Sequence, residues 1–272
     1  MSVPAMIAHL VLERLSRREP LPRIPETDQI MDDLAQNAAF TAAGREDGAL
    51  AFIYLYHAFQ ITAQIRPGER VLDMGCGPAN QLVQIARLNP QAHFVGLDAS
   101  AHMLDCARAT IARCGVSNIE LRQGDMTTLD GAADASFDGV ISTISLHHLP
   151  DLAALDAAMR AARRVLKPGG GLCLVDFGRL KRPATQRFFA EDRHDDQPEA
   201  MTRDYFNSVR AAFSADELWR AAQVFGAGIE RHATALAPFI VVIKNAARRE
   251  IGEATRCIGS AMYAGMTAQQ QR

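Results

Sequence analysis

Two acidic residues and two glycines follow neighbouring apolar runs in a spacing that suits a nucleoside ligand. Residues 70–80 read Arg-Val-Leu-Asp-Met-Gly-Cys-Gly-Pro-Ala-Asn, a short strand that runs into a turn, and Asp98 ends the next apolar run. Because glycine has no Cβ, Gly75 and Gly77 would let backbone N–H groups approach a ligand, and the helix that follows would aim its N-terminal donors at the same place. Asp98 would then accept hydrogen bonds from ribose hydroxyls. The pattern predicts a nucleoside cofactor.

The acid ahead of the turn separates two classes of nucleoside cofactor. Dinucleotide sites use GxGxxG without a preceding acid, since two phosphates must lie on the helix N-terminus. Here Asp73 stands two residues ahead of Gly75, where its carboxylate would repel a pyrophosphate and attract the ammonium group of S-adenosylmethionine (SAM). At this point the chain resembles the class I (Rossmann-like) SAM-dependent methyltransferases, whose first motif is an acid followed by GxGxG. Ala79 replaces the last glycine of that motif, and we expect a tightened turn with the site retained.

Further segments fit the same resemblance in order along the chain. Residues 118–126 form an expected third strand that ends in Gly-Asp-Met, where this family usually holds the adenine amino group with the acid. Residues 137–143 form a fourth strand, which Ser-Leu-His-His-Leu-Pro-Asp follows at 145–151. A helical stretch then ends in Lys-Pro-Gly-Gly at 167–170, interpreted as a helix stop and turn, and a fifth strand reaches Asp176. The order of these motifs is more specific than any one of them.

The resemblance implies SAM as the cofactor and a defined set of residues around it. Asp98 is expected on the ribose and Asp73 near the methionine end. Asp125 would accept from the adenine amino group, and Met126 would pack on the ring face. The expected cofactor-binding residues are Asp73, Gly75, Cys76, Gly77, Asp98, Ala99, Met103, Asp125, Met126, Thr143 and His148.

Catalysis of methyl transfer requires little special chemistry, because a sulfonium methyl is already activated. The protein must align an acceptor, exclude water and, for an oxygen or amine nucleophile, remove a proton. His147 and His148 are the first candidates for the base or orienting group, and His194 and Tyr205 are the next candidates. A structural role for the two adjacent histidines, capping or packing beneath the helix that starts near Asp151, stays open.

Composition points to a small-molecule acceptor. The 272 residues carry a formal net charge of −2, with 29 Lys and Arg against 31 Asp and Glu, so no basic field favours nucleic acid. The segment Ser-Leu-His-His also differs from the Asn/Asp-Pro-Pro-aromatic motif of enzymes that methylate nucleic-acid amines.

Neither a metal site nor a disulfide framework is expected. Asp176 alone is too little for a carboxylate cluster that would bind a metal ion. The five cysteines form no CxxC pair, which argues against a disulfide framework and a zinc site.

The same features suggest a cytoplasmic protein with no membrane partner. Apolar runs are too short or too interrupted by charge to span a bilayer, and acids and arginines within residues 13–19 do not fit a cleavable signal. A homodimer is possible.

Strand and helix patterns alternate between residues 68 and 176, which predicts an α/β fold. We expect a doubly wound, mostly parallel seven-stranded sheet with an antiparallel C-terminal hairpin, and a ligand site at the carboxyl ends of the strands. Ser214 should cap a helix. The expected strands are 70–74, 92–97, 118–123, 137–143, 171–176, 228–235 and 238–244, and the core helices are 79–88, 100–114 and 151–166.

Three regions are expected along the chain. Residues 1–67 would form an N-terminal helical cap, with helices at 5–17, 27–43 and 48–65. Residues 68–246 would form the SAM-binding domain, with a helical insertion or lid after strand five at about 179–213. Residues 247–272 would form one C-terminal helix. The cap and the insertion together would cover the acceptor.

Two other functions remain open from the sequence. An NAD(P)-dependent oxidoreductase would share the alternation, although GxGxxG and a Tyr-x-x-x-Lys pair are missing. A non-catalytic relative could bind SAM, or only a partner protein, as a scaffold. The favoured function is methyl transfer to a small molecule through an O, N, S or C nucleophile.

Overall fold

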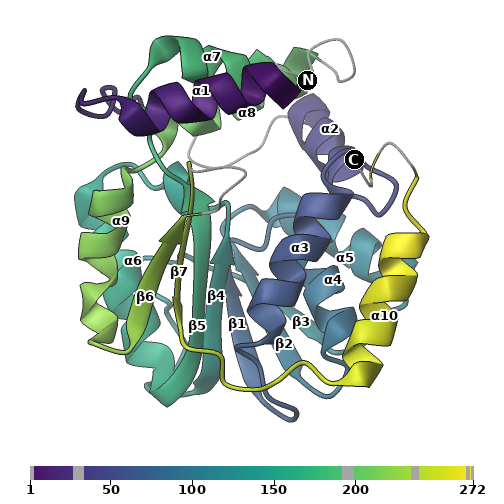
Figure 1. Cartoon of the computed structure of the whole chain (residues 1–272). Coiled ribbons are helices and arrows are strands. Elements are labelled where there is room, and N and C mark those ends of the chain that lie inside the picture. Colours follow the sequence, from purple (N-terminus) through teal and green to yellow (C-terminus); the bar gives the residue numbers. More distant parts are fainter. Residues whose placement is uncertain (1–2, 27–33, 192–198, 234–238, 268–269, 271–272) are drawn as a thin grey trace.

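A seven-stranded sheet crosses the molecule in the order β3-β2-β1-β4-β5-β7-β6 (Figure 1). The computed structural model describes residues 3–26, 34–191, 199–233, 239–267 and 270. The first five strands are parallel, β7 runs antiparallel to β5, and β6 pairs antiparallel with β7. The predicted sheet with its antiparallel C-terminal pair is confirmed. The strands are β1 (Arg70–Met74), β2 (His93–Asp98), β3 (Ile119–Gln123), β4 (Phe137–Thr143), β5 (Leu166–Phe177), β6 (Ile229–Ala233) and β7 (Ile240–Asn245).

Helices cover both faces of the sheet because successive strand residues point to opposite sides. On β2, Phe94 packs into one buried cluster and Val95 into the other. The first cluster takes residues from α3 (Ala51–Thr62), α4 (Asn80–Leu88) and α5 (Ala101–Cys114). The second takes residues from α6 (Leu152–Val165) and α9 (Ala215–Ala222). The apolar strand runs of the sequence are therefore buried on both sides.

Side-chain caps set where the core helices begin. Ser100 accepts from the Met103 N–H at the start of α5, and Asp151 accepts from the Ala154 N–H at the start of α6. The predicted cap at Ser214 is present as a full capping box at the start of α9. Short 3₁₀ turns, η1 (Leu146–His148) and η2 (Gln223–Phe225), follow β4 and α9.

Four helices lie over the carboxyl ends of the parallel strands (Figure 1). They are α1 (Val3–Leu15), α2 (Leu34–Ala43), α7 (Pro183–Glu191) and α8 (Glu199–Ala211), and we call them the cap. Within the cap, α1 packs on α7, α7 on α8 and α8 on α2. The His9 ring stacks on Phe188 with 4.2 Å between centroids. Residues 27–33 of the predicted second helix lie outside the described residues.

The beginning of β5 differs from the prediction. The strand begins at Leu166, so Lys167–Gly170 belong to it and form no turn after the helix. Leu166 pairs with Phe137, and the register then shifts before Gly171 pairs with Gly139. Lys167 Nζ donates to Asp138 Oδ1 at 2.6 Å, which ties the extra residues to β4. Residues 167–170 fall at this register shift and form an irregular part of the strand, where local Pro-Gly signals predict a turn.

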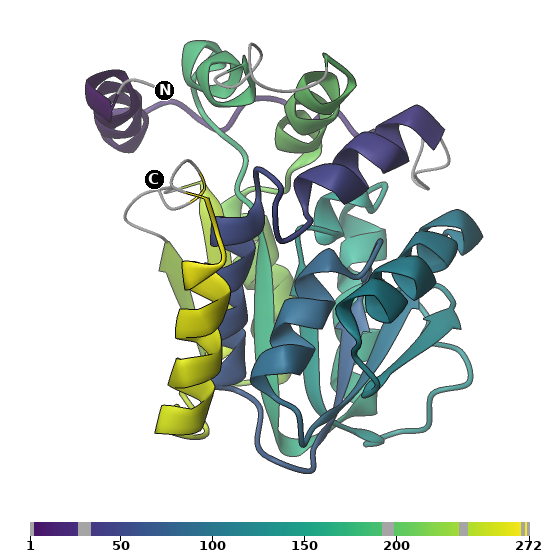
Figure 2. The ribbon, with the colours of Figure 1, turned by 90° about the vertical axis from the view of Figure 1, so that its right-hand side faces the viewer.

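The C-terminal region is not one helix as predicted. The helix α10 spans Glu253–Ala264 and lies beside α3 (Figure 2), while residues 246–252 are irregular. Arg248 Nη1 donates to Gln64 O at 2.8 Å, and Arg249 Nε donates to Thr62 O at 3.1 Å. These bonds satisfy carbonyl groups at the end of α3 and hold the connecting segment against it, a tertiary effect that overrides local helix propensity.

No helix of the described ranges combines the length and apolar character needed to cross a bilayer.

Candidate active site

The glycine turn after β1 is bonded to β2. The N–H groups of Gly75 and Cys76 both donate to Leu97 O, at 2.8 and 2.9 Å, and Gly77 N donates to Asp98 Oδ2 at 2.7 Å. These three donors are therefore bonded within the protein in this structure, and their approach to a ligand stays a prediction. Glycine is required here for space and backbone angle: φ is +75° at Gly75, and a Cβ there would lie 2.5 Å from Ser145 Cβ.

Ala79 occupies the position of the motif's last glycine in a left-handed conformation, with φ of 59°. A non-glycine residue there costs about 1–2 kcal/mol. Its N–H donates to Cys76 O at 3.0 Å, so the turn closes tightly before α4 begins. The substitution leaves the turn intact.

Asp98 and Asp73 lie on adjacent strand ends and have different partners. Asp98 Oδ1 accepts from Ser100 N at 3.0 Å, and its Oδ2 accepts from Gly77 N in the turn. These bonds favour the carboxylate, but burial outweighs them and raises the pKa of Asp98. Burial first, and then the charge of Asp98, raises the pKa of Asp73 to about 7. Asp73 is only 2% exposed, and its Oδ1 has no partner among the described residues. This end of the sheet favours a cation as neighbour.

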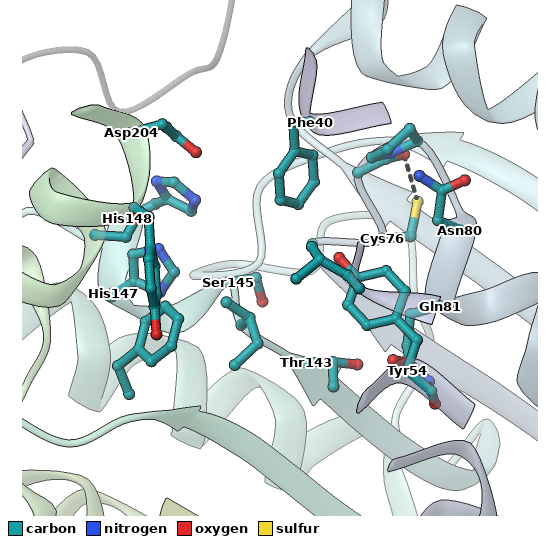
Figure 3. Close-up of a pocket in the computed structure, with 18 of the residues that line it drawn as sticks. Phe40, Tyr54, Cys76, Asn80, Gln81, Thr143, Ser145, His147, His148 and Asp204 are labelled. Atoms are coloured by element: carbon teal, nitrogen blue, oxygen red, sulfur yellow. Dashed lines mark hydrogen bonds between the residues drawn. The ribbon is translucent and has the colours of Figure 1, made fainter. Parts of the chain in front are cut away.

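A cavity of about 400 Å³ opens between the strand ends and the cap (Figure 3). Most of the residues expected to bind SAM line it, and Asp73 and Asp125 do not. Asp125 is exposed, and its Oδ1 accepts from Thr127 N at 2.7 Å. His194 lies outside the described residues. The predicted site residues that line the cavity are Gly75, Cys76, Gly77, Asp98, Ala99, Met103, Met126, Thr143, His147, His148 and Tyr205.

His147 is held from inside the protein by a buried carboxylate. Its Nδ1 lies 2.8 Å from Asp176 Oδ1, and both side chains are 2% exposed. Asp176 Oδ2 also accepts from the backbone N–H groups of Leu146 and His147, at 2.6 and 3.2 Å. Asp176, at the end of β5, therefore fixes both the η1 turn and the imidazole that the turn carries.

His148 is held from the N-terminal segment. Its Nδ1 lies 2.6 Å from Glu26 Oε2, and Ser208 Oγ donates to Glu26 Oε1 at 2.9 Å. Burial disfavours the imidazolium, but the bond to Glu26 and its charge outweigh burial and raise the pKa of His148. The same pairing outweighs burial at Glu26 and lowers its pKa. The two imidazole centroids lie 4.2 Å apart, and both histidines line the cavity. Neither histidine caps α6, because the Asp151 side chain accepts from the Ala154 N–H at the start of that helix.

Sequence reasoning missed three polar residues of this cavity wall or its support. Glu26 stands in a proline-rich segment 122 positions from His148, with no local signal for the contact. Asp204 lies in a segment with ordinary helical spacing, and nothing in that spacing predicts that its side chain lies beside His148 on the cavity wall (Figure 3). His57 is 2% exposed with neither ring nitrogen bonded among the described residues, and burial lowers its pKa to about 4.

Glu26, His147 and His148 also form a group that could offer three ligands to a metal ion. Two donors that share an ion at about 2.0–2.2 Å lie roughly 3.0–3.5 Å apart. The 2.6 Å between Glu26 and His148 is shorter and is the length of a charge-assisted hydrogen bond. The observed arrangement therefore fits a proton shared between the two groups better than a metal ion.

The comparisons with known proteins give the family. A methyltransferase domain family model matches residues 65–236. Demethylmenaquinone methyltransferase of Listeria monocytogenes serotype 4a (strain HCC23) is 33% identical over 127 residues, which are 46% of this chain and 52% of that protein. The chain thus spans about half the length of the curated relatives that it matches.

Two solved structures share the fold. An O-methyltransferase family protein from Burkholderia thailandensis superposes with a TM-score of 0.59 at 16% identity, over 88% of this chain and 70% of that one. The CurJ carbon methyltransferase gives 0.59 at 17% identity, over 82% of this chain and 62% of that one. Because one neighbour is named for oxygen and the other for carbon, the fold leaves the acceptor atom undecided.

The chain belongs to the methyltransferase domain family. It is a class I member of the SAM-dependent methyltransferases, and SAM is its cofactor. The family model and the relatives named above are all methyltransferases, which favours methyl transfer over the nicotinamide alternative.

Proposed function

We propose that the protein transfers the methyl group of SAM to a small, uncharged, largely apolar acceptor that carries an acidic hydroxyl, such as a phenol or an aromatic hydroquinone. The observation that carries this proposal is the cavity lining. Among the lining residues that the structure describes there is no lysine or arginine, so a phosphate or carboxylate on the acceptor would find no ammonium or guanidinium partner. Two imidazoles with carboxylate partners lie on the same wall.

The apolar walls support a flat ring as acceptor. Phe177, Phe189 and Phe239 form a connected aromatic group, with centroids 4.6 Å apart between Phe189 and Phe239. Tyr205 lies 5.5 Å from Phe177 and extends the group toward α8. Aromatic side chains that line a pocket give a large contact area to a planar ligand. The curated relatives are named for a quinone acceptor, which supports the same class.

The cofactor residues would act as follows. Asp98 would bind the ribose hydroxyls, Met126 would pack on the adenine, and Asp73 would lie behind the turn near the methionine end. The carboxylates of Asp73 and Asp98 favour the cationic sulfonium form over the neutral product. We propose that Asp125 accepts from the adenine amino group through the carboxylate oxygen other than Oδ1, which accepts from Thr127 N.

In the reaction, the hydroxyl proton of the acceptor moves to an imidazole of the His147–His148 pair. The deprotonated acceptor would attack the methyl carbon through its oxygen, or through a ring carbon that then releases its own proton to solvent as the aromatic ring re-forms. SAM, when bound, would supply the activated methyl group, and its sulfur would leave as a neutral thioether with the bonding electron pair. General base catalysis of this kind contributes about 10²–10⁴-fold.

The test uses methyl-labelled SAM and a matched panel of acceptors. 1,4-Dihydroxynaphthalene and 1-naphthol represent the proposed class, and 1,4-dihydroxy-2-naphthoate adds only a carboxylate. We expect transfer to the first two, at least tenfold slower transfer to the carboxylate, and NMR of the product to identify the methylated atom. Transfer restricted to the anionic acceptor would contradict the proposal, and SAM binding without any transfer would favour a non-catalytic relative.

Two finer proposals concern partners and location. The five unpaired thiols support a reducing, cytoplasmic compartment. The acidic balance supports a protein without a nucleic-acid partner, and a homodimer is proposed for testing by sedimentation.

A further inference from the structure

The segment that carries Glu26 lies outside the region matched to the methyltransferase family and runs across the active site. Residues 18–26, here called the strap, follow α1 and precede residue 65, where the family match begins. Leu21 N donates to Leu180 O at 2.9 Å, and Ile24 N donates to Arg210 O at 3.1 Å. The strap is thus bonded to the insertion after β5 and to α8.

Arg23 ties the strap to the turn that bears the histidines. Its Nη1 donates to Pro150 O at 2.5 Å, and its Nη2 donates to His147 O and Leu149 O, at 3.0 and 2.5 Å. Its Nε donates to Ala211 O at 2.7 Å, and its guanidinium lies 3.9 Å from the Phe213 ring centroid. One side chain therefore sets the distance between the strap, the end of α8 and η1.

The contact between Glu26 and His148 determines which imidazole nitrogen is free. A carboxylate accepts, so the Nδ1 of His148 donates, and in the neutral imidazole the Nε2 keeps the lone pair. Ser208 occupies the other carboxylate oxygen, which prevents Glu26 from rotating away. Charged groups from several elements surround this imidazole: Glu26 on the strap, Asp176 on β5, Asp204 on α8, Asp98 on β2 and the adjacent His147.

We propose that Glu26 is a positioning residue that holds His148 as the proton acceptor of the reaction, so that the strap completes an active site the family domain alone leaves unfinished. The inference rests on the proposed function. The acceptor's hydroxyl proton moves to Nε2 of His148, and the Glu26 carboxylate stabilises the imidazolium until the proton passes to solvent. His147 differs, because its carboxylate comes from β5 inside the family domain.

The test compares Glu26→Gln with Glu19→Gln, which removes the same charge from an exposed position of the same strap. The readouts are the pH titration of the His148 imidazole by NMR, assigned with His148→Gln, and the pH profile of transfer to 1,4-dihydroxynaphthalene. Calorimetry of SAM binding reports the integrity of the fold. Glu26→Asp tests whether a shorter carboxylate restores part of the effect.

We expect Glu26→Gln to lower the rate of transfer about tenfold to a hundredfold and to move the titration of His148 and the rising limb of the profile to lower pH. SAM affinity should stay near that of the parent, and Glu19→Gln should match the parent throughout. If Glu26→Gln fails to fold, Ser208→Ala should give the same changes at smaller size.

Several results would overturn the inference. One is a parent-like rate and pH profile in Glu26→Gln, and another is an unchanged titration of His148. A stoichiometric metal in the purified protein, with activity lost on chelation, would assign the cluster to a metal instead. If the parent methylates no phenol, the proposed function fails, and the NMR titration still tests the pairing of Glu26 with His148.

Discussion

Replacing Asp73 by Asn should remove a pH dependence from SAM binding. Asp73 is buried beneath the glycine turn, and burial together with the Asp98 charge raises its pKa to about 7. A cation bound nearby would stabilise the carboxylate and lower this pKa, so binding would release a proton. Asn has nearly the same shape and cannot titrate, which isolates the contribution of this one group.

The size of the effect follows from the ionised fraction. With a pKa of about 7, about one-eleventh of the free protein carries the carboxylate at pH 6 and about ten-elevenths at pH 8. If the complex is fully ionised, the affinity for SAM rises about tenfold across this range. Asp98 and His148 remain in Asp73→Asn, so the difference between parent and variant reports Asp73 together with its coupling to Asp98.

Folding stability provides a second readout of opposite sign. The folded pKa of about 7 lies above the usual 3.8, so the folded state holds the proton more tightly and stability is lost as pH rises from about 4 to 7. At about 1.36 kcal/mol per pH unit the loss is at most about 4 kcal/mol. Asp73→Asn should therefore be more stable than the parent at pH 8 and nearly equal to it at pH 4.

Calorimetry at pH 6, 7 and 8, in two buffers with different ionisation enthalpies, measures both the affinity and the protons released. S-adenosylhomocysteine lacks the sulfonium charge and should show a weaker dependence. The same pH dependence of SAM binding in parent and variant would refute the assigned titration. So would a parent whose affinity is flat between pH 6 and 8.

Three further predictions follow from buried or closely packed residues. His57→Leu should reduce the loss of stability as pH falls from 6.5 to about 4, by at most about 3 kcal/mol, because the folded pKa of His57 is lowered to about 4; equal acid denaturation curves would contradict this. Gly259→Ala should destabilise the protein by about 1–3 kcal/mol in urea denaturation, since a Cβ there would lie 1.9 Å from the Phe59 ring; an unchanged midpoint would show that α10 shifts freely. Asp98→Ala should weaken SAM binding tenfold to a hundredfold by calorimetry, because it removes an acceptor for the ribose and frees Gly77 N; parent-like affinity would end its proposed role.

Local sequence patterns predicted the sheet and part of the cavity wall. The alternation of apolar strands and amphipathic helices predicted a mostly parallel sheet, and strand ends with Asp or Gly marked the edge where we propose that the cofactor binds. His147 and His148 were found because they directly follow a predicted strand. Such signals lie within a few residues of one another, where backbone geometry leaves little freedom.

Other features depend on contacts between distant residues and could be decided only by the tertiary structure. The turn N–H groups bond to β2, Lys167–Gly170 extend β5, and Arg248 and Arg249 keep the start of the tail irregular. Glu26 contacts His148 across 122 positions, in a segment whose own pattern shows only prolines and charges.

Burial is likewise a tertiary property. It raises the pKa of Asp73 to about 7 and lowers that of His57 to about 4, whereas the residue types alone imply their ordinary values. The sequence by itself thus determined where a cofactor could bind, and packing decided which groups can exchange a proton there.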